Sequence, residues 1–166
     1  MRRQKPENAL KDFLDALASK KAGELTGDSF SGSDLNGESL IGVDFCQCVF
    51  DNSIFYKCDF SKANLGDASL QNTDFRKTIL LLTKFKGANC RQAKFNDARV
   101  TLAEFNDALL IQASFSGTLL QGVQFQGVDL TGAIFEKAIL KNCDFSRADL
   151  TGVYFTPEQK NSVRKV

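Results

Sequence analysis

Every fifth residue from position 25 to position 155 is Leu or Phe, apart from Cys90 and Val100. The register holds through 27 such central positions without an insertion, and 14 of the 15 Phe residues occupy them. The residue two places earlier is usually small, most often Ala. A period of five matches neither the 3.6-residue turn of a helix nor the two-residue alternation of a strand. The internal repeat therefore decides the fold.

The pattern resembles the pentapeptide repeat family, whose consensus is Ala, then Asp or Asn, then Leu or Phe, then two variable residues. The segments ANLGD at 63–67 and ADLTG at 148–152 match it closely. The resemblance implies an all-β solenoid, a right-handed quadrilateral β-helix over residues 23–156 in which four pentapeptides form each coil. The span from residue 25 to residue 155 then makes about 6.5 coils of 20 residues, with the central and small residues pointing inward.

A coil of 20 residues places residues 20 apart above one another, at the strand spacing of about 4.8 Å. Two facing inner walls are then built mainly from Phe and the other two mainly from Leu. One Phe wall is a core ladder of Phe55, Phe75, Phe95, Phe115, Phe135 and Phe155. Ten of the twelve glycines lie two residues after a central position, where we expect a corner with positive φ.

Residues 1–22 leave the repeat, and their large apolar side chains share one face of a helix. These side chains are Leu10, Phe13, Leu14 and Leu17. We expect an N-terminal capping helix that covers the first coil and hides its strand edges, with a partner-binding helix as the alternative.

At the other end, Thr156 and Pro157 predict the N-cap and first residue of a short helix or tail over residues 157–166. This segment has few apolar residues, so we expect it to cover the last coil incompletely. Members of the family that the chain resembles often dimerise end to end, and the resemblance therefore leaves a homodimer through the C-terminal coil as an alternative.

The side chains that usually carry catalysis or bind metals are scarce. The chain has no His, which removes the commonest general base and metal ligand. Of the five Cys residues, only Cys46 is expected to face outward, and it lacks the partners of a zinc set. Unpaired thiols favour a reducing compartment, so we expect a cytoplasmic protein. We predict no catalytic residue, no metal site and no cofactor, and hence no enzyme.

Seven Asp residues share the position immediately before a central residue, which the family consensus fills with Asp or Asn for hydrogen bonding in the turn. They are Asp34, Asp44, Asp59, Asp74, Asp129, Asp144 and Asp149. Because they recur with the repeat, we interpret them as structural.

One side of the predicted solenoid carries outward-facing aliphatic residues where the other sides are mostly polar. The candidate partner surface consists of Ile79, Leu81, Leu82, Arg99, Leu102, Leu119 and Ile139. A contiguous apolar patch favours a partner or dimer surface. The alternative is that aliphatic residues simply suit an exposed strand.

A second surface feature is basic, because residues 76–94 contain six Lys and Arg and no acidic residue. Folded into coils, these side chains should spread over all four sides as a belt, which makes a poor groove for nucleic acid. The sequence also lacks an apolar run of 18 residues, so no membrane span is predicted.

These observations favour a non-catalytic protein-interaction scaffold whose partner is another protein. The alternative, which comes from the resemblance alone, is a DNA gyrase-interacting mimic of duplex DNA. Between residues 25 and 155 there are 15 acidic and 12 basic residues, and the whole chain has a net charge of +1. A DNA mimic needs a dense negative field, which this balance does not supply. The family that the chain resembles is abundant in cyanobacteria, where many members have no assigned biochemical role.

Overall fold

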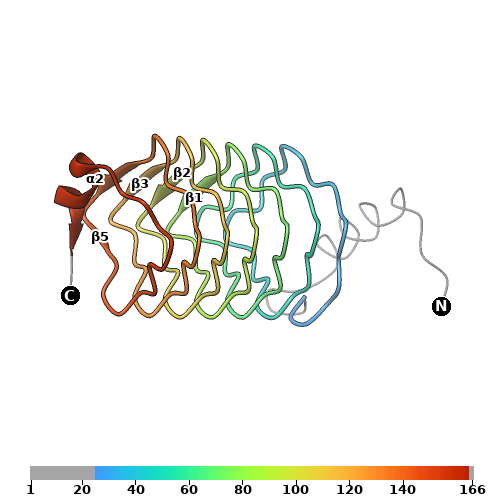
Figure 1. Cartoon of the computed structure of the whole chain (residues 1–166). Coiled ribbons are helices and arrows are strands. Elements are labelled where there is room, and N and C mark those ends of the chain that lie inside the picture. Colours follow the sequence, from blue (N-terminus) through green and yellow to red (C-terminus); the bar gives the residue numbers. More distant parts are fainter. Residues whose placement is uncertain (1–24, 165–166) are drawn as a thin grey trace.

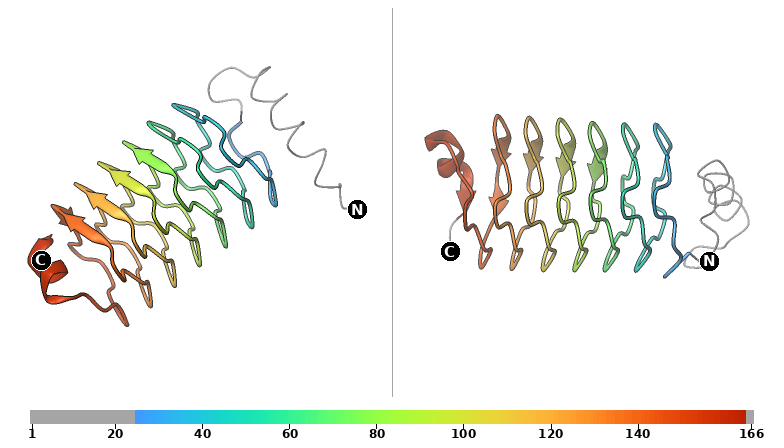
Figure 2. Two further views of the ribbon diagram at one scale, coloured as in Figure 1. Left: turned by 90° about the horizontal axis from the view of Figure 1, so that it is seen from above. Right: turned by 45° about the vertical axis from the view of Figure 1, so that its right-hand side comes forward.

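The computed structural model describes residues 25–164, of which residues 25–155 form a β-helix of stacked coils (Figure 1). Parallel bridges join residues 20 apart at four places in one coil, such as Ser29 with Val49 and Asp34 with Ile54. Each coil therefore has four sides, and successive coils are stacked along one axis (Figure 2). The helix predicted for residues 1–22 lies outside the described residues.

We number the sides by their central residues. Side 1 is centred on residues 25, 45 and onward to 145, and side 2 on residues 30 to 150. Side 3 is centred on residues 35 to 155, and side 4 on residues 40 to 140. Sides 1 and 3 face each other across the interior, as do sides 2 and 4.

Side 4 carries the only sheet of more than two strands in residues 25–164. It is parallel, with the order β1-β2-β3-β4, and each strand is displaced by 20 residues from its neighbour. The strands are β1 (Ile79–Leu81), β2 (Arg99–Thr101), β3 (Leu119–Gln121) and β4 (Ile139–Lys141). A two-stranded sheet, β5 (Cys143–Asp144) with β6 (Val163–Arg164), joins the last coil to the C-terminal segment.

The interior is filled by Phe rings from the two facing walls. Along side 3 the core ladder from Phe55 to Phe155 is buried, and successive rings lie 4.8–5.2 Å apart. Phe95 stacks on Phe115 at 4.8 Å with a 4° angle between the rings, and it meets Phe105 of side 1 edge-on at 5.7 Å. Burial and edge-to-face contact both stabilise such an arrangement.

The corners of the coils all use a left-handed backbone conformation. The predicted positive φ is confirmed for ten glycines, and sixteen non-glycine residues adopt it as well, so that every corner residue from 27 to 152 has it. In this conformation the corner N–H donates to a carbonyl one coil further along, as from Gly37 to Tyr56 at 2.9 Å. The corner therefore follows from the stacking of coils, and glycine is only one residue type that tolerates it.

Helix α2 (Pro157–Ser162) begins at the N-cap Thr156 and lies over the end of the last coil (Figure 1). Gln159 completes a capping box with Thr156, and its Nε2 donates to the carbonyl oxygens of Phe135 (2.8 Å) and Ala138 (2.9 Å). Gln159 is buried there. The C-terminal segment thus contacts the last coil through polar groups, while Ala148, Leu150 and Val153 of that coil are only partly buried.

Candidate functional site

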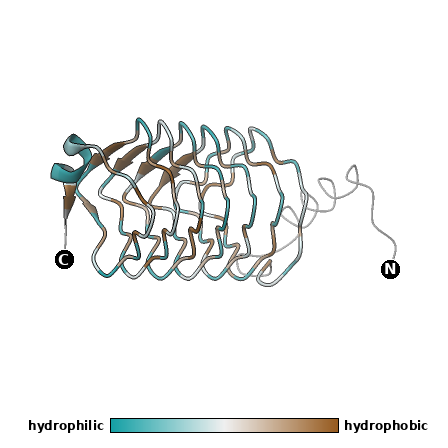
Figure 3. Cartoon of the chain, viewed as in Figure 1, coloured by the Kyte–Doolittle hydropathy of each residue, from teal (hydrophilic) through white to brown (hydrophobic). Residues whose placement is uncertain are grey.

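The candidate partner surface is one face of the β1–β4 sheet, and we call it the apolar face. The middle residue of each strand points inward, and the residues on either side of it point outward. The register places Ile79, Arg99, Leu119 and Ile139 in a single column across the four strands. The strands of this side are mainly hydrophobic (Figure 3). Ile79, Leu81, Leu82, Leu102 and Ile139 are exposed, and Leu119 is half-buried.

Leu82 and Leu102 occupy neighbouring corners at the border of the apolar face. Their φ angles are +55° and +52°, a region in which bulky side chains are uncommon. The other fourteen non-glycine corners between residues 27 and 152 carry Asn, Asp, Gln, Lys or Arg. Leu82 and Leu102 are 44% and 52% exposed, so burial does little to offset the conformational cost.

Gly122 is the next residue in the same corner column. A Cβ atom at Gly122 would lie 2.8 Å from Cδ2 of Leu102, which is closer than real Cβ contacts. The absence of a side chain at Gly122 therefore leaves room for Leu102, and the two leucines form a short apolar ridge that ends at this glycine.

Basic residues border the apolar face on both of its edges. Lys57, Lys77 and Lys137 lie at the corner shared with side 3, while Lys62 and Lys141 lie toward the opposite edge. Three cations surround the ring of Tyr56, at 5.2 Å for Lys57, 5.8 Å for Arg76 and 5.7 Å for Lys77.

The belt predicted for residues 76–94 is only partly correct. Lys84 and Lys86 lie on side 1 and Arg91 on side 2, but the remaining three basic residues share side 3. There they join Lys57 and Tyr56, which are about 20 residues earlier in the sequence. The belt prediction missed this cluster because it considered only a continuous stretch of sequence.

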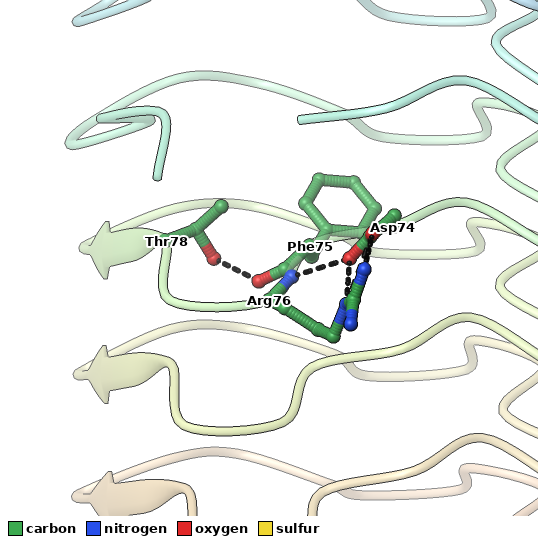
Figure 4. A network of polar contacts seen from close by, with 4 residues as sticks. All are labelled: Asp74, Phe75, Arg76 and Thr78. Atoms are coloured by element: carbon green, nitrogen blue, oxygen red, sulfur yellow. Dashed lines mark hydrogen bonds and ion pairs between the residues drawn. The ribbon is translucent and has the colours of Figure 1, made fainter. Parts of the chain in front are cut away.

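Arg76 is held in this cluster by a carboxylate (Figure 4). Its Nε and Nη2 donate to Asp74 Oδ1 at 2.8 Å and Oδ2 at 2.6 Å, and its backbone N–H donates to Oδ1 at 3.0 Å. Partial burial alone would raise the pKa of Asp74, but the hydrogen bonds and charge of Arg76 lower it. Lys57 and Lys77 have no ion pair within the described residues, so the cluster retains positive charge.

The seven repeated Asp residues are structural, as predicted. Each accepts a hydrogen bond from the backbone N–H two residues later, for example Asp44 from Cys46 at 3.0 Å and Asp129 from Thr131 at 3.0 Å. Such side-chain to backbone bonds define the turn at the corner. Within residues 25–164 no group of three or more Cys, Asp or Glu side chains could hold a metal ion.

The cysteines show no activated thiol. Cys48, Cys58, Cys90 and Cys143 are buried, and burial raises the pKa of each, to about 11 for Cys48 and Cys58. Cys46 is partly exposed, and its pKa is raised by burial and then by the charges of Asp44 and Asp67. A nucleophilic cysteine needs a lowered pKa, so the surroundings of Cys46 oppose that role.

The C-terminal end offers a second surface feature, a pocket of about 300 Å³ beside α2. Ile134 and Tyr154 line it and are 49% and 76% exposed. Within the described residues, no helix is long and apolar enough to cross a membrane.

Comparison with known proteins identifies the repeat. A pattern described as a pentapeptide repeat region matches residues 59–135, and one for eight copies of the pentapeptide repeat matches residues 29–67 and 135–156. Among curated protein sequences, none is similar enough to the chain to be a relative.

Several solved structures share the fold, and two of them illustrate it. One is a trypsin-treated variant of QnrB1, a plasmid-mediated fluoroquinolone resistance protein, with 20% identity, a TM-score of 0.62 and coverage of 85% of this chain and 88% of that one. The other is the pentapeptide repeat protein Rfr23 from the cyanobacterium Cyanothece 51142, with 20% identity, a TM-score of 0.52 and coverage of 88% and 99%. At this identity the likeness concerns the fold alone.

Proposed function

Because the chain belongs to the pentapeptide repeat family, we propose that it is a non-catalytic interaction scaffold whose apolar face binds a partner protein. The family patterns that match describe repeats, and the repeated carboxylates and buried thiols have structural explanations within residues 25–164. With five free cysteines, a reducing compartment such as the cytoplasm suits the protein.

The observation that carries this proposal is the backbone conformation of Leu82 and Leu102. A left-handed conformation costs a residue with a Cβ atom roughly 1–2 kcal/mol. Asn and Gly tolerate it better, and both occur at other corners of this chain. Two exposed leucines at adjacent strained positions give the isolated fold little in return. The fold imposes this conformation at every corner but does not require leucine there, because the other corners carry polar residues or glycine.

The preference of aliphatic residues for exposed strands does not account for these two leucines. That preference applies to Ile79 and Ile139, which lie within β1 and β4. Leu82 and Leu102 follow the ends of β1 and β2 and are not in extended conformation. They extend the apolar surface of the sheet onto the corner, which enlarges a contiguous patch of the kind that binds partners.

The experiment is affinity capture from a lysate of the source cells with the full chain as bait, in parallel with Leu82→Asn/Leu102→Asn. Asn is the matched replacement because Asn52, Asn72 and Asn142 hold equivalent corners. The control bait is Gln92→Asn/Gln112→Asn, which changes two stacked corners at the border of side 2.

We expect a protein retained by the wild-type and control baits and at least ten-fold depleted on the leucine variant. Equal retention on all three baits would remove the apolar face as the binding surface. Light scattering on the same samples shows whether the retained partner is a second copy of the chain.

A further inference from the structure

From the charge and dimensions of the apolar face, we infer that its partner is an acidic amphipathic helix of another protein, lying along the stacking direction of the coils. The inference rests on the proposed function, because it names the class of partner for the same surface.

The apolar face and its borders carry a net positive charge, whereas the remainder of the β-helix carries a net negative one. We count the outward and corner positions of side 4 in the four coils whose strands are β1–β4, together with the preceding coil. Six basic residues stand there against two acidic ones, whereas residues 25–155 as a whole hold 15 acidic and 12 basic residues. The basic residues are Lys57, Lys62, Lys77, Arg99, Lys137 and Lys141, and the acidic ones are Asp59 and Asp97. An acidic partner surface is the complement of this face.

The same charges disfavour two other binding partners of the apolar face, both of them parts of a second copy of the chain. If two copies met through this face, Arg99 and the bordering lysines would meet like charges, and like-charge contacts disfavour association. The N-terminal segment of a second copy is also unsuitable, because residues 1–22 hold six basic and three acidic residues.

The dimensions of the face fit one helix. Each strand of side 4 has three residues, which at about 3.3 Å per residue span about 10 Å, the diameter of a helix with its side chains. The column from Ile79 to Ile139 crosses four strands, or about 14 Å at strand spacing. Helix positions i, i+4, i+7 and i+11 span about 16 Å on one face. The difference of about 2 Å over four rows lies within the reach of side chains.

The order of residues in the column then predicts a pattern in the partner. Ile79, Leu119 and Ile139 require apolar side chains opposite them, and Arg99 requires a carboxylate. Arg99 lies in the second row, so the carboxylate falls at one of the two inner contact positions, whichever way the helix runs. The ridge of Leu82 and Leu102 borders the helix on one side, and Lys57 and Lys77 border it on the other.

The test is a display selection with helical peptides in which positions i, i+4, i+7 and i+11 are randomised. The full chain is the bait, and peptides that bind Leu82→Asn/Leu102→Asn are discarded. We expect enrichment of Asp or Glu at an inner position and of Leu, Ile or Val at the other three. Failure to enrich any peptide, or enrichment of basic residues at the inner positions, would overturn the inference.

A charge exchange checks the contact directly by fluorescence anisotropy. For an enriched peptide, Arg99→Glu should weaken binding at least ten-fold, and replacing the peptide's inner carboxylate by Lys should restore at least half of the loss on a logarithmic scale. The control Arg91→Glu, on the opposite side, should change binding less than two-fold. An effect of Arg99→Glu below two-fold contradicts the assigned contact.

The remaining outcomes separate this inference from the proposed function. If capture from lysate depends on Leu82 and Leu102 but the selection yields no acidic helix, the inferred helical partner is wrong. The proposed function as an interaction scaffold then still stands. Sedimentation with vesicles of phosphatidylserine and phosphatidylcholine that is lost in the leucine variant would assign the face to an anionic membrane surface instead. A concentration-dependent dimer in light scattering, lost in the same variant, would assign it to a second copy.

Discussion

Leu102 lies beside Leu82 in adjacent coils, and both residues have the left-handed backbone conformation, with φ of +52° and +55°. Polar residues and glycine fill the other corners between residues 27 and 152. The apolar face therefore combines a regular feature of the β-helix, the outward positions of its strands, with a departure from its usual corner composition. That departure distinguishes side 4 from the other sides.

The first prediction concerns the packed interior. Cys90 and Val100 are fully buried and face each other within one coil. Cys90→Asp places a carboxylate there without a partner and should lower the free energy of unfolding by about 3–5 kcal/mol. Cys90→Ala removes only the sulfur and should cost on the order of 1 kcal/mol. Urea denaturation measures both, and a Cys90→Asp protein as stable as Cys90→Ala would show that position 90 is not in the core.

A second prediction concerns the closure of the last coil. Gln159→Leu removes the side-chain donor to the Ala138 carbonyl oxygen, while the Phe135 carbonyl oxygen keeps its hydrogen bond from the Ala138 backbone N–H at 3.0 Å. One unpaired buried acceptor costs about 1–3 kcal/mol, and urea denaturation should show a loss in that range. Gln121→Leu, at an exposed position of strand β3, serves as control and should leave stability within about 0.5 kcal/mol.

The substitution Gln159→Glu should make the free energy of unfolding depend on pH, because residue 159 faces the carbonyl oxygens of Phe135 and Ala138. A carboxylate facing two carbonyl oxygens has its folded-state pKa raised above the unfolded value of about 4.3. The folded state then favours the protonated acid, which can donate one hydrogen bond. The variant should therefore be least stable relative to wild type at neutral pH and should recover as the pH falls toward 4. A difference from wild type that stays constant with pH would contradict the contact.

The thiols give a test of the register that needs no mutation. Cys46 is the one partly exposed cysteine, and its raised pKa keeps it mostly protonated at neutral pH. Iodoacetamide should therefore add one group to the native chain, faster as the pH rises, and five groups in concentrated urea. Intact mass and peptide mapping identify the sites. Native modification of Cys58 or Cys90 would contradict their inward placement.

A mimic of duplex DNA is the alternative that the family resemblance leaves open, and the charge of the β-helix opposes it. The rod carries 15 acidic and 12 basic residues, and side 4 is basic. We expect the protein neither to inhibit gyrase nor to protect it from a quinolone in a supercoiling assay. An effect at micromolar protein would show that this charge distribution is compatible with gyrase binding.

Much of this structure follows from the spacing of a few residues. The five-residue period places Phe75, Phe95 and Phe115 in one ladder because all three share the same position in a 20-residue coil. The corners were predicted only where glycine marks them, since an Asp or Lys at a left-handed corner looks like any exposed residue. Leu82 was assigned to the surface, but its strain is visible only once its φ is known.

Other features arise from contacts between residues that the repeat does not relate. Gln159 carries no apolar signal, and its role depends on carbonyl groups 21 and 24 residues earlier. Tyr56 joins Arg76 and Lys77 only because the next coil brings them beside its ring. Such contacts combine ordinary surface residues, and single-sequence patterns do not distinguish them from solvated positions.

The most direct measurement of the central claim is the free energy of unfolding of Leu82→Asn/Leu102→Asn in urea, compared with wild type. If the two leucines are strained and serve binding, their replacement should leave the protein at least as stable, with a gain on the order of 1 kcal/mol. A loss of more than about 1 kcal/mol would show that the leucines stabilise the fold, and the reason for assigning them to a partner would disappear.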